Sequence, residues 1–78
     1  MQHSQPKQSV DACGQSCPMP LLMAKRALRE LSSGDMLEVL STDPASSRDF
    51  QSLQRLAGHG VTTYHCDDGV LRHLIIKA

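Results

Sequence analysis

The chain has 78 residues, of which 40% are hydrophobic and 3% aromatic, and its 8 basic residues balance its 8 acidic ones. This length suits one small domain, because chains of about 60 residues can fold alone and typical domains have roughly 100–150. A core of this size is too small to enclose a large cofactor, so we expect the chemistry to depend on one or two surface residues. The zero net charge and the scarcity of aromatic residues argue against direct binding of nucleic acid.

Residues 1–8 are polar, include Pro6 and contain no apolar run, so we expect a disordered tail followed by one domain over residues 9–78. Nothing in this stretch is typical of a signal or transit peptide, and no apolar run approaches the ~20 residues that span a membrane. We therefore predict a cytoplasmic protein without membrane insertion. In that compartment the three cysteines are expected to be thiols rather than disulfides.

The first half of the chain predicts a short strand followed by a helix. The strand covers residues 9–13 and ends at Gly14. The helix follows Cys17, with Pro18 at its first position, because a proline there removes no intrahelical hydrogen bond. Gly34 ends the helix as a left-handed cap. Its buried side consists of apolar residues at helical spacing: Leu21, Ala24, Leu28 and Leu31.

The next segment predicts a strand and the start of a second helix. Residues 36–41 alternate between the two faces of a strand, with apolar residues on one of them. Asp43 as N-cap and Pro44 at the first position indicate where the helix begins. Ser46 and Asp49 offer a competing start one turn later, so both starts stay open.

The rest of the chain completes the fold. The buried side of the second helix is expected to comprise Phe50, Leu53, Leu56 and Ala57. Residues 58–60 stop this helix, and strands over residues 61–66 and 70–77, joined by a turn at 67–69, form a hairpin. The order is therefore β-α-β-α-β-β. Since strand–helix–strand units favour parallel strands, we predict an α+β fold, a two-layer α/β sandwich with two helices on one face of a mixed four-stranded sheet.

Cys17 is the residue best suited to chemistry. It directly precedes the predicted helix, where unpaired backbone N–H groups and the helix dipole favour a negative charge. Such a position can lower the pKa of a thiol from about 8.5 toward ~3.5–7.5, which would make thiolate available at neutral pH. The alternative is a small residue that closes the loop, with Pro18 merely starting the helix.

The residues around Cys17 also form a family motif. Residues 10–21, VDACGQSCPMPL, resemble the signature of the TusA/SirA-like sulfur-carrier family, which centres on a CPxP motif after an aspartate and a glycine. Residues 43–45, DPA, followed by Arg48 and Asp49, resemble the second motif of that family at the expected distance. The resemblance extends to the C-terminus and includes the order of the elements.

In that family the CPxP cysteine carries a persulfide. The resemblance implies that Cys17 accepts sulfur from a persulfide donor such as a cysteine desulfurase. It would then pass the sulfur to an acceptor protein, serving tRNA thiolation, molybdenum-cofactor enzymes or general sulfur traffic, with no metal and no bound cofactor. The motif residues expected to support the cysteine are Asp11, Gly14, Pro18 and Pro20.

Candidate partner contacts are Met19, in the variable CPxP slot, Arg48 in the second motif, and Lys25 on the polar side of the first helix. The alternative is a solvated or scaffold-paired side chain for Arg48 and a solvated helix face for Lys25. The chain departs from the family pattern at Gln15 and Ser16, where leucine and often arginine are common. Met19 also differs from members that have an acidic residue there. These differences bear on the identity of the partner more than on the chemistry.

Two other functions stay open. A thiol redox protein would pair Cys17 with Cys13 as a resolving thiol, although the C-x₃-C spacing differs from the C-x₂-C of thioredoxin-like motifs and Cys13 equally suits a core position. A non-catalytic adaptor would bind a partner through the open face of the sheet, since the last strand has apolar residues on both faces. Cys66 is expected to pack rather than react, and a zinc site from cysteines and histidines lacks the usual paired spacing.

Overall fold

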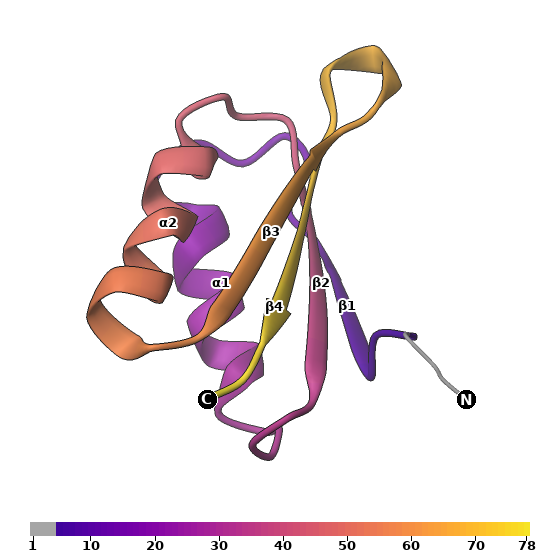
Figure 1. The fold of residues 1–78 in the computed structure, drawn as a ribbon. Coiled ribbons are helices and arrows are strands. Elements are labelled where there is room, and N and C mark those ends of the chain that lie inside the picture. The colour runs from indigo at the N-terminus through magenta and orange to yellow at the C-terminus, as the bar shows by residue number, and fades with distance from the viewer. Residues whose placement is uncertain (1–4) are drawn as a thin grey trace.

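The computed structural model describes residues 5–78 and shows two α-helices on one face of a four-stranded sheet, as predicted (Figure 1). A single turn of 3₁₀ helix, η1, connects the last two strands. The elements are β1 (Gln8–Asp11), α1 (Met19–Leu28), β2 (Met36–Ser41), α2 (Ser46–Ala57), β3 (Gly60–His65), η1 (Asp67–Gly69) and β4 (Leu71–Ile76).

The strands lie in the order β1-β2-β4-β3. β1 pairs with β2 in parallel, with Val10 opposite Val39, and β4 is antiparallel to both of its neighbours. A parallel pair needs a crossover connection, which α1 supplies between β1 and β2. The hairpin of β3 and β4 inserts β4 beside β2, so β2 and β3 run parallel without touching. Both helices therefore begin at the same end of the sheet, the end where β1 and β2 finish (Figure 1).

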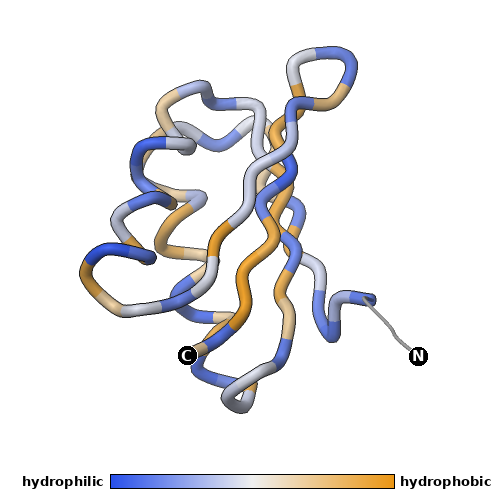
Figure 2. Tube along the Cα trace, viewed as in Figure 1, coloured by the Kyte–Doolittle hydropathy of each residue, from blue (hydrophilic) through white to orange (hydrophobic). Residues whose placement is uncertain are grey.

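The core lies between the sheet and the two helices. The alternation predicted for β2 is confirmed. Leu37, Val39 and the terminal Ser41 are fully buried, whereas the three residues that alternate with them are half-buried. α1 packs against β1 and β2, and α2 packs against β3 and β4. The strongest hydrophobic colouring follows β4, which lies inside the sheet (Figure 2). The helices contribute chiefly Ala24, Ala27, Leu28, Phe50 and Leu53 to this core.

Both helices begin later than their first predicted positions. α1 begins at Met19, with Pro18 as its N-cap, and ends at Leu28, so Gly34 shapes the turn before β2 instead of capping the helix. α2 begins at Ser46, the later of the two predicted starts, and Asp43 is not its N-cap. The reason is local, because the Asp43 carboxylate accepts a hydrogen bond from the Ala45 N–H (3.0 Å) and closes a separate turn ahead of the helix.

The end of α2 corrects the predicted buried stripe. Phe50 and Leu53 are buried as expected, but Leu56 is 82% exposed and Ala57 is also exposed. Leu56 follows Phe50 by six residues, which places it about 240° around the helix and away from the sheet. Ala57 is the last helical residue, directly before the left-handed Gly58 that ends α2. The helix therefore packs through its first two turns only.

The beginning of the chain differs slightly from prediction. β1 starts at Gln8, one residue inside the predicted tail, and the Lys7 N–H donates a hydrogen bond to the carbonyl of Met36 (2.7 Å). Residues 1–4 of that tail lie outside the described residues. Within residues 5–78, neither helix has the length and hydropathy that crossing a bilayer requires.

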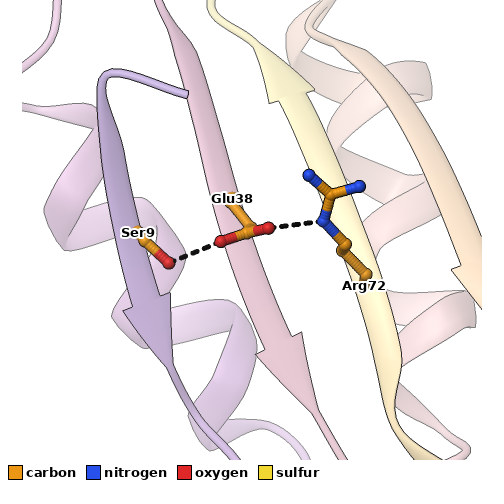
Figure 3. A network of polar contacts seen from close by, with 3 residues as sticks. All are labelled: Ser9, Glu38 and Arg72. Carbon is orange, nitrogen blue, oxygen red and sulfur yellow. Dashed lines mark hydrogen bonds and ion pairs between the residues drawn. The ribbon is translucent and has the colours of Figure 1, made fainter. Parts of the chain in front are cut away.

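The sheet face opposite the helices is mixed in character. As predicted, β4 has apolar residues on this face too, with Leu74 half-buried and Ile76 38% exposed. Between them and β1 lies a polar network in which Arg72 and Ser9 both donate to the carboxylate of Glu38 (Figure 3). The Arg72 guanidinium, followed by the Ser9 hydroxyl, holds the pKa of Glu38 below its ordinary value.

His73 occupies a core position that the sequence did not indicate. Its ring is fully buried, with Nε2 3.0 Å from the Ser46 hydroxyl and Nδ1 2.8 Å from the Thr63 hydroxyl. These two contacts satisfy both ring nitrogens and connect β4 to β3 and to the first residue of α2. Burial, with a smaller contribution from His65, lowers the pKa of His73 to about 4.

Candidate functional site

Two loops meet where the parallel strands β1 and β2 end. The first, residues 12–18, leads into α1, and the second, residues 42–45, leads into α2. The ladder continues past β1 through the Ala12 N–H, which donates to the Leu40 carbonyl (2.8 Å), and the Gly14 N–H donates to the Thr42 hydroxyl (2.9 Å). Crevices at the carboxyl ends of parallel strands are common ligand sites in open sheets, and both sequence motifs meet here.

The first loop is shaped by two of the predicted supporting residues. The Asp11 carboxylate accepts the Cys13 N–H (3.0 Å), an Asx turn that lowers the pKa of Asp11. Gly14 follows with a φ of +83°, a left-handed conformation that a side chain would strain. The turn ends where the Gln15 N–H donates to the Ala12 carbonyl (3.2 Å). Asp11 and Gly14 therefore fix the path of the chain ahead of Cys17.

Cys17, in the first motif, is exposed at the rim of this site and contacts two residues of the second motif. Its backbone N–H donates to the carboxylate of Asp43, and its thiol donates to Oδ2 of Asp49, with Sγ and Oδ2 2.8 Å apart. Asp43 thus anchors the second loop to the first with one oxygen, while its other oxygen closes its own turn. The Cys17 sulfur is positioned by residues 26 and 32 positions away in sequence.

The expected lowering of the Cys17 pKa is wrong for the free protein. The hydrogen bond to Asp49 raises the pKa of the thiol, and partial desolvation and the charges of Asp49 and Asp43 act in the same direction. The N-terminus of α1 offers little compensation, because Pro18 and Pro20 have no N–H and that of Met19 donates to the Ser16 carbonyl (2.8 Å). The prolines that stiffen the first turn also remove two of the backbone N–H groups that could stabilise a thiolate.

The other motif residues differ in exposure. Pro20 is buried and secures the first turn of α1 to the core, whereas Pro18 is exposed beside the sulfur. Met19 is 42% exposed directly after it, as a partner contact requires. Arg48 is exposed in the first turn of α2, next to Asp49, and Lys25 is exposed on α1, where it borders a shallow groove toward the C-terminus. Partner contacts at these three residues stay predictions.

Cys13 and Cys66 take no part in the hydrogen bonds of Cys17, which go to Asp43 and Asp49. Cys13 is half-buried, and desolvation followed by the neighbouring Asp11 raises its pKa. Cys66 was expected to pack, but it is exposed, at the border of a hollow of about 250 Å³ formed with Pro44 and Val70. Among residues 5–78, histidine, cysteine and acidic side chains do not gather in the groups of three that a metal ion would need.

Sequence reasoning missed Asp49 as a member of the site. The sequence indicates Asp49 as a possible helix start and as a residue of the second motif beside Arg48, with no role assigned to its carboxylate. An acidic residue in the first turn of a helix is an ordinary way to complement the helix dipole, so its position alone carried no signal of a contact with Cys17. Only the pairing of the two loops brings the carboxylate to the thiol.

Comparison with known proteins decides the family. The family model described as sulfurtransferase TusA matches residues 8–77. The chain belongs to the TusA sulfurtransferase family. It is 38% identical over 71 residues to the sulfur carrier protein TusA of Allochromatium vinosum, a match that covers 91% of this chain and 93% of that one. With the sulfur carrier protein TusA of Pseudomonas putida F1 it shares 33% identity over 72 residues, 92% of this chain and 90% of the relative.

A solved structure supports the same conclusion. The crystal structure of a SirA-like protein from Desulfitobacterium hafniense aligns with a TM-score of 0.81 at 33% sequence identity, covering 88% of this chain and 95% of that one. The TusA-family resemblance seen in the two motifs is therefore confirmed, together with the general role of a sulfur carrier.

Proposed function

We propose that this TusA-family protein carries sulfur as a persulfide on Cys17. The observation that supports this most directly is the position of its thiol, which is exposed at the junction of both motifs and held by residues from the loop after β2 and from α2. An exposed sulfur on a small rigid domain can enter the active site of a larger partner. No enclosed pocket is required, since each partner supplies the rest of the site.

The proposed donor is a protein persulfide such as that of a cysteine desulfurase. The Cys17 thiol loses its proton, and the resulting thiolate attacks the terminal sulfur of the donor persulfide. A new S–S bond forms between Cys17 and the terminal sulfur, and the S–S bond of the donor breaks. The sulfur of the donor cysteine leaves as a thiolate that takes up a proton. One sulfane sulfur is transferred from the donor cysteine to Cys17, so no external oxidant or reductant is consumed. In the second step the roles are reversed, and the thiolate of an acceptor protein attacks the terminal sulfur of the Cys17 persulfide.

The proposed acceptor is a second sulfur-handling protein in the cytoplasm rather than a nucleic acid. The chain has a net charge of zero and 3% aromatic residues, a composition that argues against the basic surface and stacking platforms that RNA binding uses. A contribution to tRNA thiolation or to molybdenum-cofactor enzymes would therefore pass through a partner protein.

The test is sulfur loading followed by intact mass spectrometry. Incubation with a cysteine desulfurase and cysteine is expected to add the mass of one sulfur atom to the wild type and to the Cys13→Ser and Cys66→Ser variants. The Cys17→Ser variant is expected to gain none. The same adduct on Cys17→Ser, or no adduct on the wild type with several unrelated desulfurases, would contradict the proposal.

A separate oxidation experiment tests the redox alternative. A Cys13–Cys17 disulfide would require one thiol to attack as a thiolate, yet the surroundings of both raise their pKa. Mild oxidation followed by peptide mapping is expected to leave these two cysteines without a mutual disulfide. Formation of that disulfide in most molecules would favour the redox function.

A further inference from the structure

The contact between Cys17 and Asp49 joins two elements that the sequence keeps apart. The sulfur belongs to the loop ahead of α1, and the carboxylate belongs to the first turn of α2, with Sγ and Oδ2 2.8 Å apart. The Asp49 N–H donates to the Ala45 carbonyl (3.3 Å), so its backbone is fixed within the helix. The dipole of α2 favours a negative charge in this turn, which means that α2 stabilises the carboxylate rather than the sulfur.

The charges that act on the sulfur are all of one sign. Asp49 faces it from α2, and Asp43 faces it from the loop after β2, where the same carboxylate binds the Cys17 N–H. Asp11, just ahead of the loop that contains Cys17, accepts a hydrogen bond from the Cys13 N–H instead. Arg48, which precedes Asp49 in the sequence, is exposed, and its positive charge does not offset the effect of the two aspartates on the pKa of Cys17. Within the described chain, the thiol is therefore held in its protonated form by an acidic pair.

We propose that Asp49 is a positioning residue that keeps Cys17 a hydrogen-bond donor in the free protein, and that a cationic side chain of the partner pairs with Asp49 and thereby releases the thiolate for transfer. This inference rests on the proposed function of Cys17. It identifies the partner surface by its chemistry, a lysine or arginine placed beside the incoming persulfide.

The proposed activation adds one proton transfer ahead of the sulfur-transfer step described above. When the cation of the partner pairs with Asp49, the S–H···O bond is lost and the thiol proton passes to solvent. The thiolate then attacks the terminal sulfur of the donor persulfide, and the departing donor thiolate takes a proton from solvent. Between encounters the protonated thiol resists alkylation and oxidation, because thiolate is the reactive species in both. Docking and activation are thus the same event.

The first test measures the thiol itself. In a chain with Cys13→Ser and Cys66→Ser, alkylation of Cys17 by iodoacetamide is followed from pH 6 to pH 10. Asp49→Asn is expected to shift the profile to lower pH and to speed alkylation at pH 7 severalfold, because the thiolate fraction rises when the pKa of the thiol falls. Asp49→Glu is expected to restore a profile close to the parent, and Asp67→Asn, which removes an equal charge at η1, to change nothing.

An unchanged or higher-pH profile for Asp49→Asn would overturn the inference. Circular dichroism and thermal unfolding of the same samples verify that Asp49→Asn and Asp49→Glu are folded. If Asp49→Asn does not fold, a shift to lower pH produced by Asp49→Ser would support the inference, and its absence would overturn it. This readout needs no sulfur donor, so it stays decisive even if Cys17 carries no persulfide in the loading experiment.

The second test compares a protein donor with a small one. Sulfur uptake by Cys17 is measured from a loaded cysteine desulfurase and from glutathione persulfide. In Asp49→Asn, uptake from glutathione persulfide is expected to rise severalfold with the thiolate fraction, while uptake from the desulfurase rises less or falls because the cation has lost its partner. Equal acceleration with both donors would overturn the role of the partner cation and leave only the effect of Asp49 on the thiol.

Discussion

The ring of His73 stacks on the ring of Phe50 inside the core, with centroids 4.1 Å apart and 9° between the planes. Phe50 comes from the middle of the packed part of α2 and His73 from β4, so the stack holds this helix against the sheet. The Ser46 and Thr63 hydroxyls satisfy both nitrogens of the same ring. A neutral imidazole fits this environment, whereas an imidazolium ion there would lose its hydration.

The burial of His73 predicts acid sensitivity. Its pKa is about 4 in the folded protein against an ordinary value of 6.5, so between these values the unfolded chain binds a proton that the native state does not. Stability is therefore complete above about pH 6.5 and declines toward pH 4, with a limiting slope of about 1.4 kcal/mol per pH unit. Urea unfolding between pH 7.5 and pH 4.5 measures this slope, and His73→Gln is expected to lose it. A slope that persists in His73→Gln would assign it to another group.

Two leucines in α2 test the corrected packing face. Leu53 is 4% exposed and Leu56 is 82% exposed. Leu53→Ala leaves a cavity and is expected to cost about 2–5 kcal/mol of unfolding free energy, whereas Leu56→Ala should change it by less than about 0.5 kcal/mol. Chemical denaturation of both variants gives the comparison. Similar losses at the two positions would mean that Leu56 packs against the domain after all.

The ion pair on the open sheet face predicts a small, salt-dependent contribution. Arg72 and Glu38 are partly solvated, with side-chain exposures of 37% and 18%. Arg72→Met keeps the apolar stem and is expected to lower the unfolding free energy slightly at low salt and still less in 1 M NaCl. Because the pKa of Glu38 is lowered from 4.5, this contribution is present above that pH and disappears as pH falls below it. Arg29→Met, at the exposed C-cap of α1, is the control and should be nearly neutral.

Asp43 separates the position of the sulfur from its charge environment. Asp43→Ala removes the acceptor for the backbone N–H groups of Cys17 and Ala45, and the loss of this turn is expected to cost about 1 kcal/mol of stability. It also removes a negative charge, so alkylation of Cys17 should accelerate while sulfur loading from a desulfurase slows severalfold. Paired alkylation and loading assays on one sample test this divergence. If both rates rise together, Asp43 acts through charge alone.

Much of the fold follows from local pattern. The strand at residues 36–41 was predicted with its observed bounds because one buried face enforces strict alternation, and the β3–β4 hairpin because its turn residues favour close reversal. Helix starts were less accurate. Around Pro18 and Asp43 a residue that can begin a helix instead lies in a separate turn, which is closed by a hydrogen bond within its own loop: Met19 N–H to the Ser16 carbonyl in the first loop, and Ala45 N–H to the Asp43 carboxylate in the second.

The sequence by itself determined the order of the elements, the family through its two motifs, and Cys17 as the candidate sulfur carrier, because each rests on residues that are close together along the chain. The tertiary structure decided the state of that cysteine. Its pKa depends on Asp49, 32 residues away, and a helix-dipole argument from sequence gives the opposite sign. The same holds for His73, whose burial depends on Phe50 and Ser46 across the sheet–helix interface. Electrostatics and burial are set by distance in space, and only the packed fold supplies that distance.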